Sequence, residues 1–600
     1  MHHRARSPAG RSHSEQHSST SSSASAFAST ASARNSATAS TSYAPRTPDS
    51  PERKPPPIHI AGLRIDGSSV ARFRIIMTVA VALVVLALCT LLLAQSAAGV
   101  QQPWAVRDAT CPDYKTYSTR RHLPYSDGPL RLPYQRPVED CRTFKSDAVE
   151  TVISEMTKRM PDHDLARLFE NCFPNTLDTT VRWHLPGSQP QSFIVTGDIN
   201  AEWIRDSTNQ LSPYMPLISK DPGLSALVLG AVHTQAEFLA ASPYCNAFQP
   251  PSQSRLKPSS NEQSDAVHPA YDPALVFECK YELDSLASFL SLANMYFEHS
   301  GDAAFVNKDS VFMNALRNVL KVLDEQALTT YNGQGQDIRS RYTFQRNTNI
   351  GTETLALHGA GNPTNVNTSL IRSAFRPSDD ATILQFFIPA NAFVAVELKR
   401  AKKLLVAAGQ NALADDVYSR GETIEKAVWE HGVYEHKVFG RVFAYEVDGY
   451  GGIINMDDAN LPSLLALPVL GFVDADNDVY RNTRRMLMSK QGNPYYLQGK
   501  EFAGIGGPHI GVRYAWPMSL LVLMRTSNDD AEIRSALNLV KRSTGGLGLM
   551  HESVNVRYVG DYTRPWFAWC NAEFAKVIID LAQRRPHIVF GHDTEAYSIG

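Results

Sequence analysis

Residues 375–398 read FRPSDDATILQFFIPANAFVAVEL, and this stretch decides how the rest of the chain is interpreted. Two adjacent carboxylates, Asp379 and Asp380, precede a long and mostly apolar run. The run predicts a buried helix over 382–407, kinked at Pro389, with the Ser-Asp-Asp sequence at its N-terminus. Ser-Asp-Asp before a helix is an ordinary N-cap. The pair therefore either caps a helix or places an acid in an active site.

Helical spacing of apolar residues continues on both sides of this stretch, and convincing strands are few. The expected helices cover about 146–160, 200–216, 222–241, 281–298, 309–327, 382–407, 412–430, 458–469, 475–489, 511–524, 529–542 and 567–584. Stacked helical hairpins bury their apolar faces against neighbours, and a closed ring leaves no end exposed. We therefore expect an all-α (α/α)6 toroid over 141–590, with its functional loops at one mouth. An open solenoid would show a fixed repeat, which the sequence lacks.

The N-terminal part of the chain differs in composition from the rest. Residues 1–57 are rich in Ser, Ala and Arg and nearly free of aliphatic residues, so we expect a disordered tail. The same composition is also typical of an organellar transit peptide. Residues 75–94 contain no charge and are long enough, at about 30 Å, to cross a bilayer as a helix. Residues 95–140 are interpreted as a stem.

The charges around 75–94 set the expected orientation. Arg72 and Arg74 precede the apolar segment, whereas its C-terminal flank carries no charge, so the tail should be cytosolic. The segment begins too far from the N-terminus for a typical cleaved signal peptide, which is the alternative. We expect a single-pass type II membrane protein whose catalytic domain lies in a lumen, by its chemistry that of the Golgi.

Seven cysteines occur in the chain, six of them beyond the apolar segment. An oxidising lumen would permit disulfides among these six, but the pairing cannot be deduced from spacing. No Cys-x-x-Cys spacing and no Cys/His cluster indicates a metal site, so no metal or cofactor is expected. The net charge of −2 gives no electrostatic argument for nucleic acid as a partner. Asn367 begins an N-glycosylation sequon, which agrees with lumenal placement.

Several loop-to-helix stretches combine acids, aromatic residues and glycines. In TGDINAEWIRDS, Trp203 can cover the apolar face of a sugar ring, and Arg205 with Asp206 can reach paired hydroxyls. A helix start with a structural ion pair is the alternative. In CKYELDSL, Glu282 and Asp284 are two residues apart, so on a helix they would point to different faces.

Three further stretches repeat this composition. Asp457 and Asp458 follow a Gly-rich segment and precede an apolar run, which again is either a capped helix or part of a site. His509 and Trp516 lie in a stretch rich in glycines and aromatic residues. Glu552 follows a Gly-rich turn, and its His-Glu pair is no zincin motif because position 555 is Asn.

Together these stretches favour carbohydrate chemistry. Carboxylates and aromatic side chains surround glycine turns, and no Ser-His-Asp nucleophile elbow is present. Glycosidic cleavage needs one carboxylic acid for the leaving oxygen and one carboxylate for water or the sugar. The residues alone leave the sugar undetermined.

Seven stretches, six of them described above, resemble motifs of one family in sequence order. TGDINAEWIRDSTNQLSPY, CKYELDSL, FRPSDDATILQFFIPANAF, GGIINMDDANLPSLL, GIGGPHIGVRYAWPMSL, GLMHESV and RPWFAWCNAEF resemble those of glycoside hydrolase family 125. The resemblance runs from about residue 140 to 590. It implies an (α/α)6 fold and an exo-acting α-mannosidase that prefers α-1,6 linkages, inverts configuration and uses no metal.

The resemblance also implies roles for particular residues. The general acid lies in the R-P-S-D-D-A motif and is Asp379 or Asp380, with Asp379 favoured, and the general base is Glu552. The expected substrate is an α-mannoside glycan. The residues expected to hold the sugar are Trp203, Arg205, Asp206, Asp457, Asp458, His509 and Trp516.

Two other interpretations are kept. A calcium-dependent α-1,2-mannosidase also uses a helical toroid, and the terminal Asp593-Thr594-Glu595-Ala596 has a weak similarity to the calcium-binding end of that family. A catalytically inactive mannan-binding protein of the Golgi is the alternative from another class. Activity in EDTA separates the first from a family 125 enzyme, and release of mannose separates the second.

Overall fold

The computed structural model describes residues 111–599 apart from 308–309 and 366, all within one compact unit, Gln102–Gly600. The expected tail (1–57), membrane segment (75–94) and first part of the stem (95–110) lie outside the described residues. The helices are α2 (Tyr114–Tyr117), α3 (Asp147–Arg159), α4 (His163–Cys172), α5 (Asn175–Thr179), α6 (Ile204–Leu211), α7 (Pro222–Ala241), α8 (Leu283–Ser300), α9 (Val311–Gln326), α10 (Ile388–Ala407), α11 (Asn411–His431), α12 (Asp478–Leu487), α13 (Pro517–Arg525), α14 (Asp530–Arg542), α15 (Ala568–Arg584) and α16 (Pro586–Val589). Short 3-10 helices are η1 (Glu139–Cys141), η2 (Ser212–Leu217) and η3 (Ser252–Ser254).

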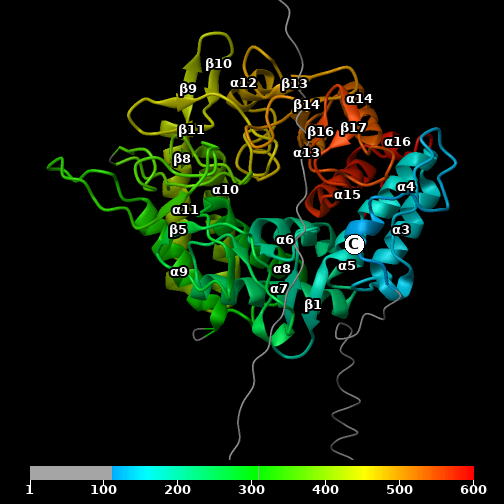
Figure 1. Ribbon diagram of the computed structural model, residues 1–600, viewed down its shortest axis with the longest axis horizontal. Helices are drawn as coiled ribbons and strands as arrows, with labels where there is room; N and C mark the ends of the chain where they lie inside the picture. Colours follow the sequence, from blue (N-terminus) through cyan, green and yellow to red (C-terminus); the bar gives the residue numbers. More distant parts are fainter. Residues whose placement is uncertain (1–110, 308–309, 366, 600) are drawn as a thin grey trace, which may run out of the picture. The chain divides into compact units, whose positions relative to one another are not determined.

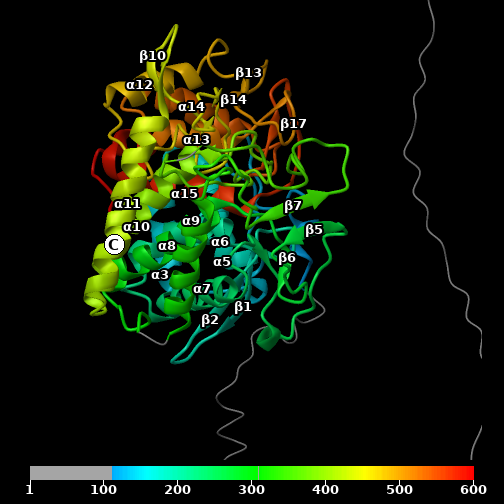
Figure 2. The same cartoon turned by 90° about the vertical axis from the view of Figure 1, so that its left-hand side faces the viewer.

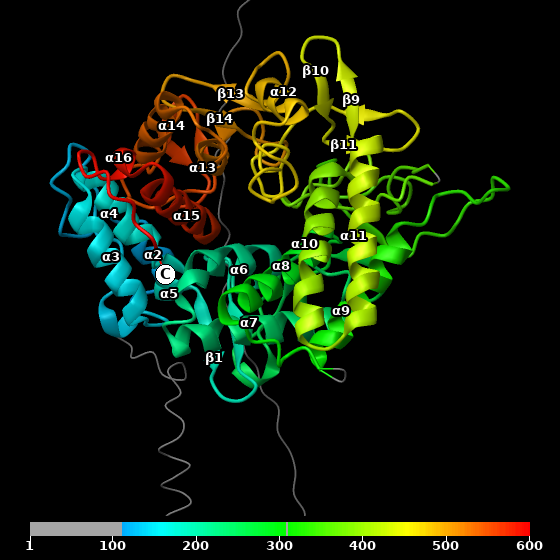
Figure 3. The same ribbon diagram turned by 180° about the vertical axis from the view of Figure 1, so that it is seen from behind.

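The helices follow one another around a ring, from α3 in cyan to α15 in red (Figure 1). The inner helices pack in sequence, α6 on α8, α8 on α10, and α13 on α15. Because α15 also packs on α4 and α6, the end of the chain closes the ring against its beginning. The outer helices cover this inner layer, with α7 and α9 packed together, α11 on α10 and α14 on α13 (Figure 3).

Short antiparallel strands connect the helices. They are β1 (Val181–Leu185), β2 (Gln191–Ile194), β3 (Glu202–Trp203), β4 (Ala247–Phe248), β5 (Asp265–His268), β6 (Val276–Glu278), β7 (Thr343–Arg346), β8 (Phe386–Phe387), β9 (Val433–His436), β10 (Gly440–Phe443), β11 (Glu446–Val447), β12 (Ile453–Ile454), β13 (Tyr496–Gln498), β14 (Ala503–Ile505), β15 (Tyr514–Ala515), β16 (Val554–Asn555) and β17 (Tyr558–Tyr562). They form small ribbons such as β3-β4-β6, β8-β11-β12 and β15-β16-β17. Seen from the side, β5, β6, β7 and β17 lie on one side of the helices (Figure 2). Sequence periodicity missed these strands because ladders of two to five residues have no measurable period.

The prediction of a helical ring is confirmed in part, and one inner helix is replaced by turns. Residues 458–469 contain no helix. Pro462 and Pro468 remove backbone donors that a helix through this segment would need. The backbone N–H groups of Leu464 and Leu465 instead donate to the Asp457 carboxylate, at 2.9 and 3.0 Å.

Residues 375–398 also differ from the predicted structure. α10 begins at Ile388, so Asp379 and Asp380 do not cap it, and Pro389 lies in its first turn, where a missing N–H costs nothing. Residues 375–381 form a closed loop: Arg376 N–H donates to the Asp380 carbonyl at 2.8 Å. Within this loop Asp379 has a φ of 66°, which is uncommon for a residue other than glycine.

α7 is the one helix among the described residues that is long and apolar enough to cross a membrane. It is mostly buried and packs against α9, α8 and β2. A buried core helix passes the same test of length and composition, so α7 is interpreted as part of the core.

A buried ion pair fixes the start of this loop, and breaking it should destabilise the fold. Arg376 Nε donates to Glu446 Oε1 at 2.6 Å, and both side chains are almost wholly buried. Glu446→Ala would leave the Arg376 charge buried without its partner, so we expect a loss of about 3–5 kcal/mol in chemical denaturation. Asp324→Ala, which breaks an exposed pair with Arg420, is the control and should cost less than about 1 kcal/mol. Equal losses in the two variants would contradict this role.

Candidate active site

The N-cap residues of the inner helices form no side-chain cap, whereas those of several outer helices do. Outer helices such as α7 and α14 begin with an aspartate whose carboxylate accepts a backbone N–H. At α6, α8, α10, α13 and α15 no side-chain cap is present, and the preceding extended residues are Trp203, Glu282, Phe387, Trp516 and Phe567. Helix N-termini carry partial positive charge, so they favour nearby anions.

Arg205 lies at the centre of a buried carboxylate cluster on α6 and α8. Its Nη1 contacts Glu282 Oε2 at 2.7 Å and Asp284 Oδ2 at 3.3 Å, and its Nη2 contacts Asp206 Oδ2 at 3.0 Å. Glu282 and Asp284 thus reach the same cation. They do not point to different faces, because Glu282 precedes the helix in extended conformation. Arg205 also lies over the Trp569 ring, 5.3 Å from its centroid.

Asp379 is partly exposed and lies beside this cluster. Its Oδ1 accepts long hydrogen bonds from Trp203 Nε1 at 3.4 Å and Asn246 Nδ2 at 3.5 Å. Burial favours a raised pKa, but the charges of Lys280 and Arg205 outweigh it and hold the pKa of Asp379 below its usual value. By itself Asp379 is therefore ionised at neutral pH.

Asp380 is buried and points to a different set of partners. Its Oδ2 accepts the Ser378 hydroxyl at 3.1 Å, and its Oδ1 lies 3.5 Å from His509 Nδ1. Burial would lower the pKa of His509, but the hydrogen bond and charge of Asp380, and then the charges of Asp379 and Glu552, raise it to about 9. The Asp380–His509 contact is therefore an ion pair at neutral pH.

Glu552 is nearly buried and is held by side chains from the following segment. Thr563 Oγ1 donates to Glu552 Oε2 at 2.8 Å, and Arg564 Nε lies 3.3 Å from Oε1. Arg564 also forms an ion pair with Asp198. The neighbouring His551 is neutral, since burial lowers its pKa to about 4, and its Nδ1 donates to the Arg564 carbonyl at 2.7 Å.

Electrostatics bring the two halves of the predicted catalytic site together. The charges of Asp380, Asp379 and Glu552 all raise the pKa of His509. The charges of Glu552, Asp198 and Asp379 likewise raise the pKa of Arg564. The negative charges of Asp379 and Glu552 therefore both act on His509 and on Arg564. The two predicted catalytic carboxyls lie near the same two cations.

The other predicted sugar-binding residues differ in what they contact. Asp458 lies near Asp380, which raises its pKa after the larger effect of burial, and its Oδ1 accepts the side-chain amide of Asn460 at 2.9 Å. Asp457 is buried, and both its oxygens close the 457–465 loop. Trp516 is also buried, and the structure gives it a packing role against Phe567.

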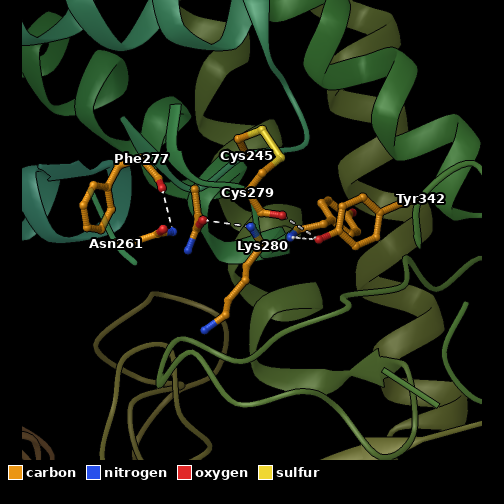
Figure 4. The surroundings of a disulfide bond; sticks show 8 residues. Cys245, Asn261, Phe277, Cys279, Lys280 and Tyr342 are labelled. Carbon is orange, nitrogen blue, oxygen red and sulfur yellow. Dashed lines mark hydrogen bonds between the residues drawn. A yellow bond between two sulfur atoms is a disulfide. The ribbon is translucent and has the colours of Figure 1, made fainter. Parts of the chain in front are cut away.

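Two residues near Asp379 were missed in the sequence, Asn246 and Lys280, and each follows a cysteine. Cys245 and Cys279 form a disulfide that joins the start of β4 to the end of β6 (Figure 4). The Asn246 side chain accepts the Lys280 backbone N–H at 3.0 Å. Tyr342 binds the same segment: its hydroxyl donates to the Cys279 carbonyl at 2.8 Å (Figure 4). Knowledge that Cys245 pairs with Cys279 would have placed Asn246 and Lys280 near each other, but sequence spacing cannot reveal this pairing.

The other four described cysteines comprise one further disulfide and two free thiols. Cys111 and Cys141 form a second disulfide, whereas Cys172 and Cys570 are buried thiols. The six cysteines beyond 75–94 thus give two disulfides and two free side chains.

Removing the Cys245–Cys279 disulfide should destabilise the protein. The Cys245→Ala/Cys279→Ala variant opens a loop closed over a separation of 34 residues, so we expect a loss of about 3–4 kcal/mol in chemical denaturation. Cys111→Ala/Cys141→Ala opens a loop of similar separation, 30 residues, and is the matched control with a similar expected loss. If only the Cys245→Ala/Cys279→Ala variant loses less than about 1 kcal/mol, the hydrogen bonds of Asn246 and Tyr342 hold this segment in place without the disulfide.

The titration of His509 can be measured directly. We expect NMR of histidine-labelled protein to show His509 charged across neutral pH and losing its proton as the pH rises through about 9. Asp380→Asn removes the main stabilising charge, so the midpoint should fall toward the ordinary value of about 6.5. His509→Gln assigns the signal. An unchanged midpoint in Asp380→Asn would contradict the ion pair.

Comparisons with known proteins agree with the motifs. A profile of the metal-independent alpha-mannosidases (GH125) matches residues 162–579. The meiotically up-regulated gene 157 protein of Schizosaccharomyces pombe is 56% identical over 489 residues, covering 81% of this chain and 95% of that protein. A solved Streptococcus pneumoniae structure of a metal-independent α-mannosidase, in a non-productive complex with α-1,6-mannobiose, is 31% identical with a TM-score of 0.66. It covers 73% of this chain and 99% of its own.

These findings confirm the resemblance. A metal-independent family also argues against the calcium-dependent alternative. The Asp593 and Glu595 segment that suggested calcium contacts Arg159 instead, with Asp593 Oδ2 at 2.8 Å from Nε. The chain therefore belongs to glycoside hydrolase family 125, the metal-independent α-mannosidases.

Proposed function

We propose that this protein is an inverting exo-α-mannosidase that removes terminal α-1,6-linked mannose, with Asp379 as general acid and Glu552 as general base. The observation that carries the proposal is the set of contacts around the two carboxyls: Asp379 accepts Trp203 Nε1 at 3.4 Å, and Glu552 is held by Thr563 and Arg564. Family membership supports the sugar, and the α-1,6-mannobiose bound to the Streptococcus pneumoniae relative supports the linkage. No metal is needed for this chemistry, since the two carboxyls supply both acid and base.

Asp379 fits the role of acid better than Asp380 does. Asp379 is partly exposed, whereas Asp380 is buried between Ser378 and the His509 cation. The left-handed backbone at Asp379 is strained, and such strain is retained mainly where it serves a function. We infer that Asp380 holds His509 in its charged state for the sugar hydroxyls and that Asp379 faces the glycosidic oxygen.

Glu552 fits the role of base because its surroundings favour the carboxylate. Arg564 and Thr563 donate to its two oxygens, and neutral His551 holds the Arg564 backbone. In an inverting enzyme the two catalytic carboxyls stand about 6.5–9.5 Å apart, which leaves room for the attacking water. Trp203, Arg205, Asp206, Asp458 and His509 remain the proposed sugar-binding residues, and Asp457 and Trp516 act by fixing the loops around them.

We also propose an (α/α)6 toroid in which the turns of residues 458–469 replace one inner helix. We further propose that residues 75–94 anchor the chain as a type II membrane protein with its catalytic domain in the Golgi lumen. Two disulfides support an oxidising compartment, and the exposed Asn367 of the sequon agrees with it. Protease protection of tagged protein in sealed microsomes tests the orientation: a lumenal C-terminus is expected, and digestion of the C-terminal tag would contradict it.

Substrate class is tested with the full-length protein in detergent. We expect mannose release from α-1,6-mannobiose at an undiminished rate in EDTA, with α-1,2- and α-1,3-mannobiose cleaved much more slowly. Cleavage of only the α-1,2 isomer, or loss of activity in EDTA, would favour the calcium-dependent alternative. No release from any isomer would favour a catalytically inactive mannan-binding protein.

The roles of the two carboxyls are tested by substitution. Asp379→Asn and Glu552→Gln should each lower kcat for α-1,6-mannobiose by about 10²–10⁴-fold, as loss of a general acid or base does. Only Asp379→Asn should keep its rate on 2,4-dinitrophenyl α-mannoside, because that leaving group needs no proton. Asp478→Asn, on an exposed helix, is the control. If Asp380→Asn shows this leaving-group dependence and Asp379→Asn does not, the two assignments must be exchanged.

A further inference from the structure

The proposed acid has a difficulty that the structure itself resolves. A general acid must carry a proton, yet Lys280 and Arg205 stabilise the ionised form of Asp379. Lys280 is buried, lies over the Phe375 ring at 5.3 Å, and follows the disulfide that fixes its backbone. A proton donor next to Asp379 is therefore required.

Glu282 is such a donor by its position. Its side chain is wholly buried and lies close enough to Asp379 to lower the pKa of that carboxyl as a hydrogen-bonding neighbour. Oε2 is occupied, with Arg205 Nη1 at 2.7 Å and Ser285 Oγ at 2.9 Å. Oε1 is buried, and no donor group of the described residues bonds to it, so this oxygen is the one available to a second carboxyl. Two carboxyls can share a hydrogen bond only if one of them keeps its proton.

The loop that carries Asp379 is fixed against the segment that carries Glu282. Phe375 N–H donates to the Tyr281 carbonyl at 3.0 Å, one residue before Glu282. The Ser373 hydroxyl accepts the N–H of Leu283, one residue after it, at 3.0 Å. The two carboxyls are therefore held together by the backbone and not by a flexible surface contact.

The charge balance around the pair also calls for a proton. Asp206, Glu282 and Asp284 contact Arg205, and Asp379 lies beside them. The charge of Lys280 also acts on Asp379, but its Nζ already lies 3.4 Å from Glu278 Oε1. His509 and Arg564 approach Asp379 from the opposite side, but each already has its own carboxylate partner, Asp380 and Glu552.

Burial also favours the protonated form of Glu282. Burial, and then the charges of Asp284 and Asp379, raise the pKa of Glu282 well above its usual value. Burial raises the pKa of Asp206 and of Asp284 only to about 6, because Arg205 opposes the effect.

We propose that Glu282 and Asp379 share one proton, and that this is the proton delivered to the glycosidic oxygen. The inference rests on the proposed function. Because Glu282 acts through Asp379 and does not touch the substrate, it is a positioning residue.

Each transfer in this scheme is balanced. At rest the proton lies on Glu282, and on substrate binding it crosses to Asp379, leaving Glu282 ionised against Arg205 and Ser285. Asp379 then protonates the glycosidic oxygen while the C1–O bond breaks and its electron pair stays on that oxygen. Water forms the new bond to C1 and gives a proton to Glu552. After release, that proton returns through water to the Glu282–Asp379 pair.

Glu282→Gln in the full-length protein tests the proposal, because glutamine keeps the shape but carries no acidic proton that it can transfer to Asp379. At pH 7 we expect kcat for α-1,6-mannobiose to fall about 10²-fold. The loss should shrink as the pH is lowered, since Asp379 can then take a proton from solvent. The rate on 2,4-dinitrophenyl α-mannoside should stay at the wild-type value. If this variant fails to fold, Glu282→Asp retracts the proton by one methylene and should show the same leaving-group dependence.

Asp284→Asn is the matched control, since Asp284 shares Arg205 Nη1 but acts on Asp379 only through its charge. It should affect both substrates equally. A wild-type rate and pH profile in Glu282→Gln, equal losses on the two substrates, or the same leaving-group dependence in Asp284→Asn would overturn the shared proton. Inactivity of the wild type on both substrates would instead overturn the proposed function.

Discussion

The Arg205 guanidinium, buried among three carboxylates, is the interaction on which the site depends. It joins the first turn of α6 to the start of α8, so it couples two neighbouring inner helices to one charge. A buried cation of this kind is stable only with partners, and the partners are stable only with the cation. The excess of negative charge that remains forces a proton into the cluster. The stability of the fold around Arg205 therefore depends on the protonation state of its carboxyl neighbours.

The closure of the ring explains why such a cluster can be held in place. α15 packs against α6 and α4, so the helix that carries Trp569 also covers Arg205. The N-cap residues of α6 and α8 form no side-chain cap, and the partial positive charge of these helix N-termini can stabilise nearby carboxylates. The packed helices thus support the loops that bear Asp379, Glu552 and His509.

Much of the site could be predicted from sequence because its residues lie in local motifs. Asp379, Glu552, Arg205 and His509 were identified in this way, and the structure brings them into one cluster. The helix cap at Asp379 was wrong, since the apolar run that follows it does not turn into helix until Ile388. Local patterns could not reveal this, because a β-ladder and long-range ion pairs decide where the helix begins.

Partnerships across the chain were also beyond local patterns. The Cys245–Cys279 disulfide, the Arg376–Glu446 pair and the contact of Glu282 with Asp379 join segments far apart in sequence. Each of these three contacts sets the charges around residues that the sequence motifs had already indicated as candidates for the site. Sequence thus predicted which groups act, and the contacts made by the fold are the basis for the proposed position of the proton.

The stereochemistry of the first product tests the central claim most directly. Proton NMR can follow the hydrolysis of α-1,6-mannobiose in heavy water before mutarotation equilibrates the anomers. With Asp379 as acid and Glu552 activating water on the opposite face, β-mannose should form first. Initial formation of α-mannose would mean a covalent intermediate, and it would contradict the account given for both carboxyls.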